Sequence, residues 1–194
     1  LRQMRLGVDL SYDATAGTLD IDRFDAQLGP GNQLALTARL SDLPAGLTPG
    51  QLLPKDLLES SAIHAMDLKL ANSDLFESMA VTWLMLIYPS FGDTPEQAVQ
   101  TVQGMARNWV AGIPDSLTAA EDRSHLAALI DSIPNPQGEL HLTLDAPKGL
   151  SPSRIESAVM AAEKPGWAAA ETLLEGARLT ARWTPSILVP VPAP

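Results

Sequence analysis

The 194-residue chain contains no cysteine, which excludes disulfide bonds, thiol nucleophiles and thiolate metal sites. A chain without cysteine suits either redox compartment and avoids mispaired thiols in an oxidising one. Positive charge is also scarce, because 13 Lys and Arg stand against 23 Asp and Glu and give a formal net charge of −10. An acidic surface repels a phosphate backbone and the sequence shows no basic stripe, so we expect no nucleic-acid partner.

Long apolar runs are missing too. No run reaches the roughly 18 apolar residues that span a bilayer, and the longest, from Met79 to Tyr88, is interrupted by Thr82 and followed by Pro89. We therefore expect no transmembrane segment in this chain. The sequence starts at Leu1 rather than Met, so a signal peptide or a membrane anchor upstream stays an open alternative.

The N-terminal part alternates apolar and polar residues, the pattern of half-buried strands. We predict a three-stranded antiparallel meander over residues 6–42, with turns at Ala16-Gly17 and Gly29–Asn32. A phase shift at Arg23-Phe24 predicts a bulge. The third strand places three leucines on one face that we expect to be buried: Leu34, Leu36 and Leu40.

The rest of the chain mixes strands with helices. We predict strands at 62–71, 139–145 and 178–183, and helices that begin at Ser73 or Asp74, at Asp93 or Thr94, at Ser116 or Thr118, at Ser151 and at Trp167. The fold class is therefore α+β: an antiparallel sheet with an N-terminal three-stranded meander and helices packed on one face. We expect one domain over 1–184 with a helical subdomain at about 73–134, and a proline-rich tail at 185–194. Whether the fourth and fifth strands are parallel or separated stays open.

Catalytic motifs are lacking, and we assign no catalytic residue and no cofactor. There is no Gly-x-Ser-x-Gly, and Ser124 and His125 would point about 100° apart on a helix. A hydrolase that uses carboxylates such as Asp20, Asp22 or Glu139 is the enzymatic alternative, and it would need a cleft where such groups converge.

Two groups of polar residues could in principle bind a metal. His64 and His141 occupy comparable places in two strand-to-helix units, but they lack a third ligand in sequence. Aspartates cluster in the first hairpin, where calcium is conceivable but a solvated surface is favoured: Asp9, Asp13, Asp20, Asp22 and Asp25. We expect no metal site.

One predicted helix is apolar nearly all round. Its spacing aligns four large side chains that we single out as the candidate ligand-binding residues: Phe76, Met79, Trp83 and Leu86. Such a helix either lies in the core or faces something apolar. The core is the favoured interpretation, and a surface that contacts a lipid or a partner protein is the alternative.

Several segments resemble uncharacterised extracytoplasmic proteins of alphaproteobacteria, in families of domains of unknown function. They are residues 63–75, 93–97 and 136–147, and the resemblance extends over about residues 60–165. The meander at 17–42 is also similar to the repeated strands of envelope proteins of the AsmA type. The resemblance implies export to the periplasm, often with an N-terminal membrane anchor, and it implies no catalytic residue.

Together these observations favour a non-catalytic periplasmic or envelope domain that binds a lipid or an envelope protein through an apolar surface. The carboxylate hydrolase and a purely structural envelope component remain the alternatives.

Overall fold

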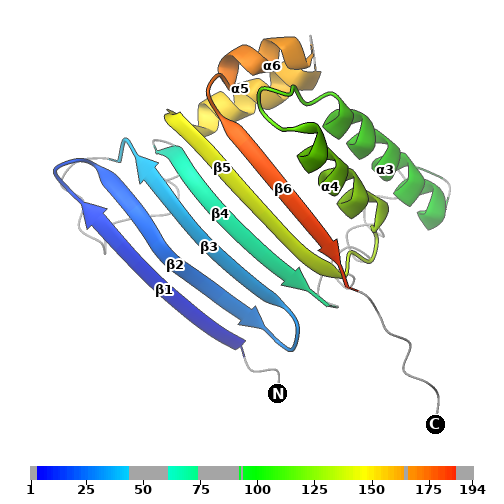
Figure 1. Cartoon of the computed structure of the whole chain (residues 1–194), viewed down its shortest axis with the longest axis horizontal. Coiled ribbons are helices and arrows are strands. Elements are labelled where there is room, and N and C mark those ends of the chain that lie inside the picture. Colours follow the sequence, from blue (N-terminus) through cyan, green and yellow to red (C-terminus); the bar gives the residue numbers. More distant parts are fainter. Residues whose placement is uncertain (1–3, 44–60, 74–91, 93, 164–165, 187–194) are drawn as a thin grey trace.

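A computed structural model describes residues 4–43, 61–73, 92, 94–163 and 166–186 (Figure 1). Within these ranges the chain forms one six-stranded sheet in the order β1-β2-β3-β4-β5-β6, and every neighbouring pair is antiparallel. The strands are β1 (Met4–Asp13), β2 (Thr18–Leu28), β3 (Gln33–Ser41), β4 (Ala62–Asn72), β5 (Gly138–Leu150) and β6 (Arg178–Pro185). The described helices are α3 (Pro95–Ala111), α4 (Ala120–Asp131), α5 (Pro152–Glu163) and α6 (Trp167–Leu173).

The predicted N-terminal meander is confirmed. β1 pairs with β2 and β2 with β3, and the connecting turns use Gly17 and Gly31 at φ of 64° and 71°, a backbone conformation that glycine adopts without strain. The register of β2 against both neighbours shifts around Asp22 and Arg23, which confirms the predicted bulge. The three leucines of β3 share one face but are half-buried rather than fully buried: Leu34, Leu36 and Leu40.

The strands β4 and β5 are antiparallel neighbours, so the expectation that this pair is parallel or separated is wrong. Lys69 lies opposite His141 and Leu68 opposite Leu142, although α3 and α4 come between the two strands along the chain. The strand at the C-terminal end runs to Pro185, so the first residue of the expected tail belongs to the sheet.

Two helices begin where their sequences predict. The Thr94 side chain accepts a hydrogen bond from the backbone N–H of Gln97 at 3.3 Å, and Pro95 opens α3. Ser151 accepts one from the N–H of Arg154, also at 3.3 Å, ahead of α5. A side-chain cap followed by proline is a typical helix start.

The start predicted for α4 is wrong. We expected a cap at Ser116 or Thr118, but the helix begins at Ala120, and Ala119 before it has no side-chain cap. The chain instead turns at this point, because the N–H of Thr118 donates to the carbonyl of Pro114 at 3.0 Å. Thr118 is fully buried, so its side chain is committed to packing rather than to capping.

The described helices gather at the β5–β6 end of the sheet (Figure 1). Three small clusters of buried residues join them there. One cluster links the end of β5 to the residue that precedes β6, through Ala146, Leu150 and Ala177. Trp167 at the start of α6 meets Trp109 of α3 with ring centroids 4.7 Å apart. These contacts confirm the α+β class and place the helical layer on one side of the molecule.

Candidate functional site: two faces of one sheet

One face of the sheet is apolar across all six strands. The pairing register aligns three unbroken rows of facing residues, each running from β1 to β6. The rows are Leu6, Ala26, Leu34, Leu70, Leu140 and Trp183; Val8, Phe24, Leu36, Leu68, Leu142 and Ala181; and Leu10, Ile21, Ala38, Met66, Leu144 and Leu179. No charged, amide or hydroxyl side chain interrupts any of the three rows, so the open part of the face offers apolar contact.

The rows differ in exposure from one end to the other. At β6, Ala181 and Trp183 are buried. At β1, the exposed fractions are 60% for Leu6, 45% for Val8 and 54% for Leu10. The apolar face is therefore covered where the helices gather and open at the opposite edge. A soluble monomer rarely exposes a contiguous apolar patch of this kind without a function for it.

The opposite face is polar, and its carboxylates are matched by nearby donors. Arg23 lies 3.0 Å from Asp9 and 3.4 Å from Asp25, and Arg39 lies 2.7 Å from Asp20. This arrangement accounts for much of the aspartate cluster as a network of charges on the solvent side, which was the favoured interpretation. The carboxylate of Asp20 raises the pKa of Arg39 above its usual value through a hydrogen bond and its charge.

The remaining two aspartates of the cluster bind local donors. Asp22 accepts a hydrogen bond from the Ser11 hydroxyl at 3.0 Å. Asp13 accepts from the backbone N–H groups of Thr15 and Ala16 at 2.8 and 3.0 Å. Both bonds lower the pKa of Asp13, and the bond from Ala16 has the larger effect.

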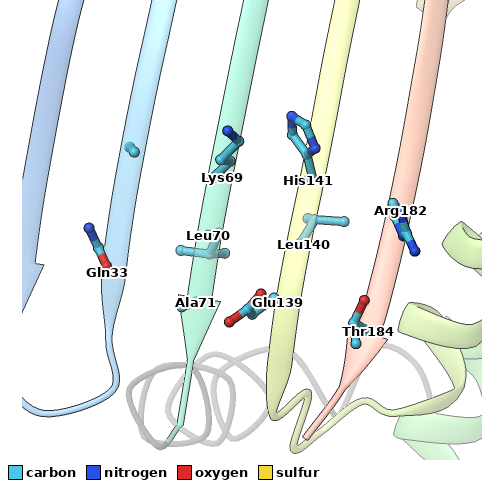
Figure 2. A pocket seen from close by; sticks show the side chains of 10 residues that line it. Gln33, Lys69, Leu70, Ala71, Glu139, Leu140, His141, Arg182 and Thr184 are labelled. Carbon is cyan, nitrogen blue, oxygen red and sulfur yellow. The ribbon is translucent and has the colours of Figure 1, made fainter.

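The polar face is hollowed in two places. A hollow of about 430 Å³ lies over β3 to β6 and is lined by Lys69, Glu139, His141 and Arg182 among others (Figure 2). A second hollow of about 410 Å³ lies over β2 to β5 and includes Asp20 and Asp22. The carboxylates of the hydrolase alternative are therefore divided between two hollows: Asp20 and Asp22 line one, and Glu139 lines the other.

The histidines bind separate partners. His141 lies on the polar face, as its strand parity predicts, and its Nε2 is 2.7 Å from the Asp67 carboxylate. His64 Nε2 is 2.7 Å from the Ser41 hydroxyl. The register places His141 opposite Lys69 rather than His64. In the part of the chain that the structure describes, no three His, Cys, Asp or Glu residues are grouped so that they could hold a metal ion.

The four candidate ligand-binding residues of the apolar helix lie outside the described residues, so they remain predictions: Phe76, Met79, Trp83 and Leu86. Sequence reasoning missed the open apolar edge at β1. The signal was present as alternation of apolar and polar residues in all six strands, with a change of phase at the bulge in β2. An apolar face of a sheet is normally expected to be buried, so the alternation alone did not indicate that its β1 edge is exposed.

Comparison with known proteins adds no relative: no family model, no curated protein and no solved structure matches the chain. Among the described helices, none is both long enough and apolar enough to cross a membrane.

Proposed function

We propose that this protein is a non-catalytic periplasmic or envelope domain that binds the acyl chains of a lipid along the apolar face of its sheet. The observation that supports the proposal is the set of three unbroken apolar rows, which are open at β1. The extracytoplasmic location is supported by the resemblance to exported proteins, and the absence of cysteine is compatible with it.

The chemistry of the rows favours a lipid over a protein. A protein interface combines an apolar core with about one hydrogen bond per 100–200 Å² of buried area. Apart from the indole N–H of Trp183, which is buried at β6, the aligned rows carry no strong side-chain donor or acceptor, and an acyl chain requires none. The main gain on binding would be the removal of apolar surface from water, at about 25 cal/mol per Å².

The dimensions of the sheet are compatible with such a ligand. Neighbouring strands lie about 4.8 Å apart, so a row that crosses six strands is about 24 Å long. One leaflet of a bilayer contributes about half of its roughly 30 Å hydrocarbon core. Because the β6 end of the rows is buried, an acyl chain would lie along the part of a row that extends from β1, and entry there needs no opening of the described helices.

The test is equilibrium binding of a fluorescent polyene fatty acid to the purified protein. We expect saturable binding by the natural chain, and about tenfold weaker binding by the double variant Val8→Gln, Leu10→Gln, which loses apolar contact at two rows. Both side chains are about half exposed, so the melting temperature should change little.

The matched control is Ser11→Gln, which adds the same side chain to β1 on the polar face. It should bind the polyene as the natural chain does. Equal affinity of the two variants, or no binding by the natural chain, would contradict the proposal. The second result would favour a purely structural role.

A further inference from the structure

The two edge strands of the sheet, β1 and β6, differ in whether the rest of the chain hydrogen-bonds to their outer backbone groups. At β6, the backbone N–H of Leu179 donates to the Leu117 carbonyl at 2.8 Å, and the N–H of Ala181 donates to the Asp122 carboxylate at 3.0 Å. The carbonyl of Trp183 lies 3.2 Å from Nδ1 of His125. Three alternate residues of this edge are thus paired with groups from α4 and the segment before it, and a further strand cannot add there.

In the part of the chain that the structure describes, the β1 edge has little of the usual protection beyond its charged residues Arg5, Asp9 and Asp13. Natural sheets block their edges with proline, inward charges, lysine or a covering element. β1 is ten residues long, contains neither proline nor lysine, and exposes its apolar side chains, Met4 at 68% included. Within the described part of the chain, β2 is its only strand partner. The sheet can therefore grow in one direction only.

The sequence of β1 complements itself when it is reversed. We infer that β1 pairs antiparallel with β1 of a second copy of this chain, with Gly7 opposite Gly7 on a two-fold axis. In this register Arg5 lies opposite Asp9 of the other copy and Leu6 lies opposite Val8, twice each by symmetry. The axis is perpendicular to the sheet, so the apolar faces of both copies lie on the same side.

The charges distinguish this register from its neighbours. Centring the pair on Arg5 or on Asp9 would place like charges opposite each other, which destabilises a strand pair. A parallel pairing in register would do the same. Centring on Asp9 would also bring Arg5 opposite Asp13, but at the cost of the Asp9–Asp9 pair, whereas the register centred on Gly7 opposes Arg5 to Asp9 twice and places no like charges of β1 opposite each other.

The ion pairs near Asp9 leave its carboxylate able to bind a further cation, such as Arg5 of a second copy. Arg23 serves both Asp9 and Asp25, so two carboxylates share one guanidinium at this edge. In the described part of the chain Arg5 has no ion-pair partner, and its side chain is exposed. Arg5 of a second copy would supply the missing positive charge. This inference does not depend on the proposed lipid binding, because these charges lie on the polar face.

The first experiment measures the dimer dissociation constant by analytical ultracentrifugation. The natural chain should dimerise, and Arg5→Glu or Asp9→Lys alone should each raise the dissociation constant by about tenfold, since each replaces two attractions by two repulsions. The double variant Arg5→Glu, Asp9→Lys should restore most of the affinity. A natural chain that stays monomeric, or a double variant no better than the single ones, would overturn the inference.

The second experiment fixes the register with a single thiol, which is unambiguous in a chain without cysteine. A Cβ at position 7 would have the Arg23 side chain at 3.7 Å as its nearest neighbour, an ordinary contact, so Gly7→Cys should fold and form a disulfide-linked dimer on mild oxidation. Arg5→Cys is the control, because its two thiols would be offset by four residues, about 13 Å along the strands, and beyond disulfide reach.

Equal cross-linking of the two cysteine variants would overturn the register. The Arg5→Glu variant also separates the two proposals of this work, because it should bind the polyene as a monomer. Loss of dimerisation with intact polyene binding would contradict neither proposal, whereas absent polyene binding by a chain that still dimerises would contradict lipid binding alone.

Discussion

At the scale of single residues, Asp13 makes the stability of the turn between β1 and β2 depend on pH. Its carboxylate accepts two backbone hydrogen bonds, which lower its pKa in the folded protein. In the unfolded chain the pKa is about 3.9. A lowered folded pKa means that the stabilisation is present above the unfolded value and is lost as the pH falls through the folded value.

We therefore expect Asp13→Ala to melt below the natural chain at pH 7 by a margin that narrows at pH 2, as measured by circular dichroism. Asp13→Asn is the control, because an amide oxygen can accept the same bonds without titrating. Its difference from the natural chain should stay constant with pH between about 5 and 7, where the carboxyl is ionised in both the folded and the unfolded chain. A deficit of Asp13→Ala that is the same at both pH values would contradict this assignment.

Thr118 is a second residue whose side chain has a predictable effect on the free energy of unfolding. Its side chain is fully buried, and its hydroxyl is the one buried side-chain oxygen or nitrogen without a hydrogen-bond partner in the described part of the protein. An unpaired buried hydroxyl costs about 1–3 kcal/mol. Thr118→Val should raise the free energy of unfolding by about 1 kcal/mol in urea titrations, whereas Thr118→Ser, which keeps the hydroxyl and loses a methyl group, should lower it.

At the scale of elements, the cap on the β6 edge makes a separate prediction. Asp122 of α4 accepts the N–H of Ala181, and this contact ties the helix to the strand. Asp122→Ala leaves that half-buried N–H without its acceptor, at a cost of about 1–3 kcal/mol. Glu121→Ala, one position away in the first turn of the same helix, is the matched control. Equal loss of stability in the two variants would show that the charge at the helix start matters rather than the edge contact.

The elements themselves were largely predictable. Alternation located the strands, because a half-buried strand repeats every two residues whatever it pairs with. It could not predict that β4 and β5 are neighbours, since that depends on contacts across the intervening helices. The start of α4 was misplaced because Thr118 reads as a cap locally, while tertiary packing buries it.

The candidate site was predictable in one respect and not in another. The parity of Leu6, Val8 and Leu10 predicts an apolar face, and the register confirms it. Whether that face is covered depends on where the helices settle, and no local pattern encodes this. The described helices gather at β5 and β6 (Figure 1), so β1 keeps its apolar side chains in solvent.

At the scale of the whole molecule, this one-sided arrangement predicts a gradient of local stability. β5 is joined to α5 by a buried cluster and β6 to α4 by edge hydrogen bonds, whereas β1 contacts β2 alone among the described strands. Amide protection tracks such differences in local contacts. Hydrogen exchange followed by mass spectrometry should therefore find slow exchange in β5 and β6 and fast exchange in β1 of the monomeric Arg5→Glu variant.

The same measurement tests how the molecule completes its sheet. In the natural chain, exchange in β1 should slow as protein concentration rises, because pairing with a second copy would satisfy the backbone groups of its free edge. Exchange in β6 should not change, since that edge is already paired within the chain. Protection that rises equally at both edges would indicate non-specific association. A rise confined to β1 would mean that two copies share one twelve-stranded sheet, in which the Leu6 row of each copy continues into the Val8 row of the other and Leu10 lies opposite Met4.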